Sequence, residues 1–165
     1  MGLSASRRVH AAVGSAVFLV AAPGVVAGVI PWLLTGWQSS HPPVPVVALG
    51  SILVVAGAVL VMYAFAGFVS EGAGAPAPVA PTQRLVVGGL YRYVRNPMYL
   101  AVGTMIIGQP LLLGRASLLG YAAIFYAVVI AFVRGYEEPV LAARYGDEYR
   151  AYRRAVPGWW PRLRP

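Results

Sequence analysis

The chain of 165 residues is 59% hydrophobic and only 11% charged, whereas a soluble domain averages about 25% charged residues. It contains no cysteine, which excludes disulfides, thiolate catalysis and cysteine-ligated metals. The formal net charge of +8 comes from thirteen arginines against five acids. Because the arginines flank apolar runs instead of forming a basic domain, we expect a membrane protein and no nucleic-acid partner.

Four apolar segments follow one another along the chain. Between Val9 and Ser70 there is no Asp, Glu, Lys or Arg, a stretch longer than the roughly 18–20 residues that cross a bilayer as a helix. The first segment contains Pro23 and Pro31, so we expect it to be kinked or to end early. The sequence predicts an all-α integral membrane protein with about four transmembrane helices. The predicted spans cover residues 9–37, 44–69, 97–113 and 116–133.

The N-terminal segment has an alternative interpretation as a cleaved signal peptide. Arg7 and Arg8 precede an apolar stretch, and Ala21-Ala22-Pro23 is similar to a cleavage site. The apolar run continues well past that point, beyond the 7–15 residues of a signal core. We therefore expect this segment to remain as the first span.

The last two spans are separated by Gly114 and Arg115 alone, so we expect a tight antiparallel hairpin. Pro97 suits the first position of a helix, where its missing N–H costs nothing, and Asn96 is its expected N-cap. The hairpin brings the start of the third span beside the end of the fourth.

The chain divides into three parts. Residues 1–70 form a two-span N-terminal scaffold, and residues 71–84, rich in Gly, Ala and Pro, form a flexible cytosolic linker. Residues 85–165 form the half that carries the chemistry. Since the loops on the opposite side hold only Arg115, we expect both termini and the site to be cytoplasmic, in a bacterial inner or plasma membrane.

The sequence after the fourth span predicts an amphipathic helix at the membrane interface. Gly146 is expected to end one short helix and to precede the start of another. Tyr145, Tyr149 and Tyr152 follow the spacing i, i+4, i+7, which places them toward lipid or protein. The arginines on the other faces then meet lipid headgroups. They are Arg144, Arg150, Arg153 and Arg154.

Two polar clusters lie at the cytoplasmic ends of the last two spans. Arg95 and Tyr99 belong to the first cluster, and Glu137 and Glu138 belong to the second. Adjacent carboxylates at a membrane boundary are costly unless they have cationic or hydrogen-bonding partners. Arg95 and Arg134 are the nearest candidate partners in the sequence.

At these clusters the sequence resembles the isoprenylcysteine carboxyl methyltransferase and phospholipid methyltransferase superfamily. The resemblance rests on RNPMYLA at residues 95–101 and on EEPVLAARYGDEYRAYRRAVP at residues 137–157. Asn96 stands where the family has histidine, and Ala101 where it has glycine. The resemblance implies binding of S-adenosylmethionine and methyl transfer to a lipophilic acceptor at the cytosolic membrane face.

Within this resemblance each polar group has an expected partner. The glutamates suit the ribose diol or the ammonium of S-adenosylmethionine, Arg95 suits its carboxylate, and tyrosine rings suit the adenine or the sulfonium. Arg95 and Glu138 are the predicted catalytic residues, and we expect no metal. The predicted cofactor-binding residues are Arg95, Asn96, Pro97, Tyr99, Leu100, Glu137, Glu138 and Tyr145. The predicted substrate-binding residues are Arg134, Tyr149 and Arg153.

The acceptor is expected to be a lipid or lipidated small molecule. A carboxylate, as in an isoprenylcysteine-like substrate, is already nucleophilic at pH 7 and needs no general base, whereas an amine must first lose a proton. His10 and His41 both lie outside the clusters, which favours a carboxylate or thiolate-like acceptor over an amine.

Two other functions remain open from the residues alone. Membrane sterol reductases share a similar Asn-Pro-x-Tyr and Tyr-Gly-x-x-Tyr pattern, and a protein of that type would bind NADPH in the same cleft. A small non-enzymatic lipid-binding scaffold would use the polar clusters only as anchors.

Overall fold

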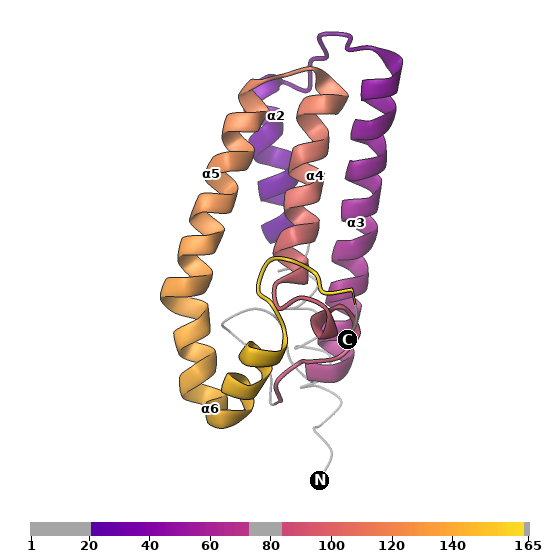
Figure 1. Cartoon of the computed structure of the whole chain (residues 1–165). Coiled ribbons are helices and arrows are strands. Elements are labelled where there is room, and N and C mark those ends of the chain that lie inside the picture. The colour runs from indigo at the N-terminus through magenta and orange to yellow at the C-terminus, as the bar shows by residue number, and fades with distance from the viewer. Residues whose placement is uncertain (1–20, 73–83, 164–165) are drawn as a thin grey trace, which may run out of the picture.

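The computed structural model describes residues 21–72 and 84–163 (Figure 1). These residues form helices joined by short turns and contain no strand, which confirms the all-α prediction. Two of the helical segments, η1 and η3, are π-helices, and η2 is a 3₁₀-helix. The elements are η1 (Val25–Val29), α2 (Ile30–Thr35), α3 (Val44–Gly72), η2 (Gly89–Arg92), α4 (Pro97–Leu113), α5 (Ser117–Phe132), η3 (Val133–Glu137) and α6 (Glu138–Ala155).

Two helical segments are long and apolar enough to cross a membrane. They are Val44–Gly67 in α3 and the continuous helix Ser117–Ala155, which contains α5. The apolar helices Ala21–Thr35 and Pro97–Leu113 are shorter, so the count of four spans stays a prediction. The start of the first expected span, with Arg7 and Arg8, lies outside the described residues, as do residues 73–83 of the expected linker.

Helices α3 and α4 pack along a seam of glycines. A Cβ added at Gly50 would lie 2.5 Å from the backbone nitrogen of Leu112, and one added at Gly57 would lie 2.7 Å from the carbonyl oxygen of Ala101. Small residues let helix backbones approach closely in lipid, where no hydrophobic force drives helices together. The seam therefore fixes α4 against α3.

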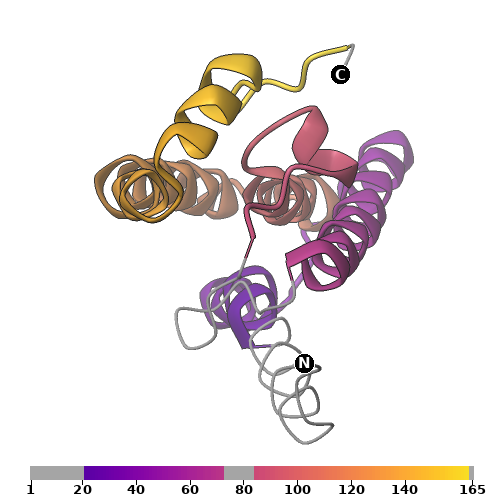
Figure 2. The same ribbon diagram turned by 90° about the horizontal axis from the view of Figure 1, so that it is seen from below.

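Seen along the bundle, α5, α4 and α3 form a row with α4 at its centre (Figure 2). Helix α2 lies on one side of this row, and α6 extends to the other side. The turn between α4 and α5 is as tight as expected, with Gly114 in the left-handed conformation at φ 65°. Ser40 donates its N–H to Leu113 O at 2.9 Å, and Arg115 Nε donates to Gln38 O at 3.0 Å. These bonds tie the α2–α3 connection to the turn.

The N-terminal helix contains a π turn that ends at Val29, two residues before Pro31. Within η1 the N–H of Ile30 donates to Val25 O, five residues back instead of four. Pro31 has no N–H, so it supplies no donor to the carbonyls that lie four and five residues before it. Those carbonyls belong to Ala27 and Val26.

Side chains from two other helices satisfy these freed carbonyls. Gln109 Nε2 on α4 donates to Ala27 O at 2.6 Å, and the Tyr121 hydroxyl on α5 donates to Val26 O. Neighbouring helices must supply such donors in a bilayer, because the hydrocarbon offers no water. The helix consequently continues through Pro31 to Thr35, and a π turn replaces the expected early end.

A second π turn, η3, joins α5 to α6. The N–H of Glu138 donates to Val133 O, and Pro139 follows this turn just as Pro31 follows the first. The expected end of the helix near Val133 is wrong, because the π turn carries the helix on through Glu137 and Glu138. The bend comes instead at Gly146, where φ is 54° and ψ is −124°, which confirms that glycine as a break.

Candidate functional site

Asn96 occupies the N-cap position of α4, and Pro97 is the first helical residue, as expected. The prediction that the Asn96 side chain caps the helix is wrong. Its Nδ2 donates instead to the carbonyl of Gly158 at 3.0 Å, and Asn96 is buried. The amide nitrogen donates to the C-terminal segment, and within residues 21–72 and 84–163 no side chain accepts a hydrogen bond from the first turn of α4.

The hairpin brings the two polar clusters into direct contact. Arg95 Nη1 lies 2.6 Å from Glu138 Oε1 and donates to the Tyr149 hydroxyl at 3.2 Å. Glu138 is buried and Arg95 is largely buried, with 10% of the Glu138 side chain and 13% of the Arg95 side chain exposed. The predicted juxtaposition of the start of α4 with the two glutamates is therefore confirmed.

A second arginine completes the environment of Glu138. Arg153 Nη2 lies 3.2 Å from Glu138 Oε2, so each carboxylate oxygen faces its own guanidinium. Arg134, the other expected partner, is exposed and makes no ion pair with the described residues. Arg134 lies on the exposed side of η3, whereas α6 folds back after Gly146 and presents Arg153.

Glu137 contacts a different residue of α4. The Tyr99 hydroxyl donates to Glu137 Oε2 at 3.1 Å, which links the first turn of α4 to η3. Among the described residues, Glu137 Oε1 has no hydrogen-bond or ion-pair partner. The adjacent glutamates thus differ, because both oxygens of Glu138 are engaged by arginines and one oxygen of Glu137 is not.

Residues 156–163, which we call the C-terminal strap, cross the start of α4. Arg95 donates its backbone N–H to Pro157 O at 2.9 Å and its Nε to Val156 O at 3.0 Å. A Cβ added at Gly158 would lie 3.1 Å from Arg95 Nη2, so this position fits a glycine closely. Arg162 ties the strap further by donating its backbone N–H to Tyr93 O at 3.0 Å.

Two contacts of the site carry no clear signal in the sequence. Tyr152 donates its hydroxyl to the carbonyl of Tyr91 at 2.7 Å, and its ring lies 6.5 Å from that of Tyr149. The strap contributes mainly backbone carbonyls, which every residue has. The spacing of Tyr149 and Tyr152 predicted that they face lipid or protein, and the structure places both toward protein.

The other predicted site residues lie around this cluster. Leu100 is half-buried on α4. Tyr145 is half-buried just before the bend at Gly146, with the Arg144 guanidinium 5.6 Å from the centre of its ring. The bend separates Tyr145 from the helical turn that carries Tyr149, so the three-tyrosine stripe is interrupted. The binding roles of these residues stay predictions.

A solvent-exposed ion pair lies beyond the bend. Arg150 Nη2 lies 2.7 Å from Asp147 Oδ1, and both side chains are largely exposed. The hydrogen bond and the charge of Arg150 lower the pKa of Asp147. This local i, i+3 pair gives a surface counterpart to the buried pair of Arg95 and Glu138.

The cluster offers binding groups of both charges. Glu137 presents a carboxylate, Tyr99 presents a phenol, and the uncapped N-terminal turn of α4 carries the positive end of the helix dipole. These groups suit a ligand that itself carries both an anionic and a cationic part. The cluster contains no histidine, the side chain whose ordinary pKa lies nearest pH 7.

The comparisons with known proteins agree with the two motifs. The family model described as phospholipid methyltransferase matches residues 45–148, which include α3, α4, α5 and most of α6. The chain is also 33% identical over 78 residues to a protein-S-isoprenylcysteine O-methyltransferase of Schizosaccharomyces pombe. That alignment covers 47% of this chain and 33% of the yeast protein, so the chain spans about a third of the curated relative it matches. On the strength of the family match, which takes in both membrane helices and both glutamates, the chain belongs to the phospholipid methyltransferase family.

Proposed function

We propose that this protein transfers a methyl group from S-adenosylmethionine to a lipophilic acceptor at the cytosolic face of a membrane. The observation that supports this most strongly is the contact between the start of α4 and the Glu137–Glu138 pair. This contact joins the two motifs of the family in one cluster at the end of an apolar hairpin. A water-soluble methyl donor and a lipid acceptor can meet at such a boundary.

The side chains of the cluster fit S-adenosylmethionine by their chemistry. The donor carries a sulfonium-bound methyl group, which supplies the reaction with an activated carbon. Glu137 is the carboxylate best suited to the ammonium or the ribose diol, because one of its oxygens is uncommitted. The uncapped start of α4 suits the carboxylate of the donor, and Tyr99 offers a ring at the same turn.

Arg95 and Glu138 support the reaction chiefly by holding the site together. Their ion pair joins α4 to α6, and Arg95 also binds two strap carbonyls. Methyl transfer is an in-line displacement, so its rate depends strongly on how well the reacting atoms are aligned. Loss of either residue would loosen the alignment of the whole cluster.

The proposed acceptor is the carboxylate of an isoprenylcysteine-like or other lipid substrate. The yeast relative is, by its name, a protein-S-isoprenylcysteine O-methyltransferase, which supports an oxygen acceptor on a lipidated cysteine. A carboxylate needs no general base, and the cluster holds no histidine that would serve as one. Arg134 and Arg153, both exposed, are suited to an anionic acceptor approaching from the interface.

Binding of S-adenosylhomocysteine to detergent-purified protein, measured by titration calorimetry, tests the cofactor. Glu137→Gln keeps the size and one acceptor oxygen but replaces the other oxygen by an NH2 group and removes the charge, so it should weaken binding at least about tenfold, since a charged hydrogen bond contributes about 1.5–3 kcal/mol. Asp147→Asn removes an exposed carboxylate outside the cluster and serves as the matched control.

Transfer of a labelled methyl group to a farnesylcysteine analogue, with the corresponding amide as control, tests the acceptor. Folded wild-type protein that binds no S-adenosylhomocysteine would overturn the whole proposal. Binding with methylation of the amide, or of lipid amines in place of the carboxylate, would overturn the acceptor class alone.

A further inference from the structure

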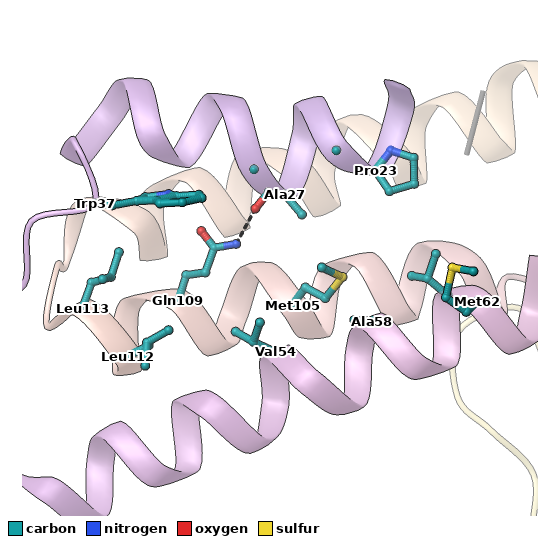
Figure 3. A pocket seen from close by; sticks show the side chains of 13 residues that line it. Pro23, Ala27, Trp37, Val54, Ala58, Met62, Met105, Gln109, Leu112 and Leu113 are labelled. Carbon is teal, nitrogen blue, oxygen red and sulfur yellow. Dashed lines mark hydrogen bonds between the residues drawn. The ribbon is translucent and has the colours of Figure 1, made fainter. Parts of the chain in front are cut away.

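A second site lies within the apolar part of the bundle, away from the polar cluster. A cavity of about 780 Å³ lies between the N-terminal helix and α3, with α4 along its floor (Figure 3). Ligand pockets commonly measure about 300–1,000 Å³. On α3 its lining runs from Val54 to Met62 and on α4 from Met105 to Leu113, which at 1.5 Å per residue corresponds to a groove about 12 Å long. A groove of this length accommodates part of an extended lipid chain.

One buried polar atom of the groove lacks a partner. Gln109 is 8% exposed, and its Oε1 makes no hydrogen bond in the described part of the chain. The orientation of the amide is fixed, because Nε2 donates to Ala27 O at 2.6 Å and a flipped amide would place two oxygens together. The free atom is therefore an acceptor, and it calls for a donor.

Water is a poor candidate for that donor. A buried water molecule typically makes about three hydrogen bonds, and the rest of the lining is almost entirely hydrocarbon. The side chains of Met62, Met105 and Leu112 are typical of this apolar lining. A long apolar molecule that carries one hydroxyl satisfies Gln109 and fills the remaining length with apolar contacts.

We propose that this groove binds a long-chain alcohol, with its hydroxyl donating to Gln109 Oε1. Gln109 lies twelve residues along α4 from Pro97, or about 18 Å from the polar cluster. The site is thus distinct from the proposed methyl-transfer site and does not depend on it. An occupant there would bridge the N-terminal helix and α3 through the groove.

The chain offers a matched pair of variants to test the groove. Gly28 lines it, and a Cβ added there meets no atom within 4 Å, so Gly28→Leu adds side-chain volume to the lining from an open backbone position. Gly120 on α5 is equally open and lies outside the lining, so Gly120→Leu is the control.

The probe is a photoreactive hexadecanol analogue, compared with its methyl ether, on full-length protein in lipid nanodiscs. Wild type and Gly120→Leu should be labelled by the alcohol about tenfold more efficiently than by the ether, as one added hydrogen bond predicts. Gly28→Leu should lose this labelling. Gln109→Met should label equally with alcohol and ether, and circular dichroism verifies that each variant is helical.

Equal labelling of wild type by alcohol and ether would overturn the proposal, as would full labelling of Gly28→Leu. Two other occupants are also distinguished. The chain has no cysteine, so Gly28→Cys gives a single reactive site. Cross-linking of that site to a second copy, or to a residue in segment 1–20 of the same chain, without labelling by the alcohol, would assign the groove to protein instead.

Discussion

The two π turns of this protein use the same local device in two different environments. Each is a five-residue turn separated by one residue from a proline, namely Pro31 after η1 and Pro139 after η3. At the first turn, side chains from α4 and α5 bind both carbonyls that the proline leaves free. At the second turn, no side chain of the described residues binds the corresponding carbonyls, which belong to the exposed Arg134 and Gly135.

The difference follows from the solvent around each turn. In hydrocarbon a freed carbonyl needs a protein donor, whereas at an aqueous boundary water supplies one. The comparison therefore favours an apolar layer at η1 and a watery interface at η3. The second turn is instead stabilised through the side chains that it presents, since Tyr99 binds Glu137 and two arginines bind Glu138.

The largest expected loss of stability comes from substituting a side chain at the second π turn, Glu138. Glu138→Ala leaves Arg95 buried without its ion-pair partner, and removal of one partner of a buried pair costs about 3–5 kcal/mol. The free energy of unfolding, measured in detergent, should fall by that amount. Asp147→Ala, which breaks the exposed pair with Arg150, should leave it unchanged. Equal effects of the two substitutions would contradict the buried role of Glu138.

Removing the side-chain donors at the first π turn should lower the free energy of unfolding by a smaller amount. Tyr121→Phe and Gln109→Leu each leave one carbonyl without a partner in the apolar layer, at a cost of about 1–3 kcal/mol. Equilibrium unfolding in mixed micelles measures this loss. Tyr126→Phe, on the same helix, is the control for removing a tyrosine hydroxyl from α5.

The proline itself should determine how much the Gln109 donor matters. Pro31→Ala restores an N–H at position 31, so Gln109→Leu should then cost about 1 kcal/mol less than it does in the wild-type background. A double-mutant cycle on unfolding free energies measures this coupling. Strictly additive effects would show that the side chain does not replace the missing backbone donor.

The smallest effect on stability is expected at Pro139. Because water can satisfy the carbonyls of the second turn, Pro139→Ala should change the unfolding free energy by less than about 0.5 kcal/mol. We expect weaker binding of S-adenosylhomocysteine, however, since an ordinary α turn would move Glu137 away from Tyr99. Unchanged affinity would mean that the π turn does not position Glu137.

The sequence predicts some elements accurately because strong local signals bound them. Helix α4 begins at Pro97 and ends at Leu113 as predicted, since proline suits a first turn and Gly114 adopts the left-handed conformation that ends a helix. Gly146 was also identified as a break, although the helix before it is longer than predicted.

The parts of the site that the sequence does not reveal depend on contacts between distant residues. The π turns cannot be inferred from Pro31 or Pro139 alone, because proline also ends or kinks helices. The Asn96 amide meets the carbonyl of Gly158, 62 residues away, so its local preference for capping was overridden. Arg153 replaced Arg134 as a partner of Glu138 because of the bend in α6.

The donors that complete the first turn have a consequence for biogenesis. The helix with Pro31 leaves the ribosome before Gln109 and Tyr121 have been synthesised. Until α4 and α5 are made, two of its peptide groups lack their final partners, which disfavours full release from the translocon into lipid. We therefore expect the helix that contains Pro31 to reach its final position in the bilayer last, after the α4–α5 hairpin has inserted.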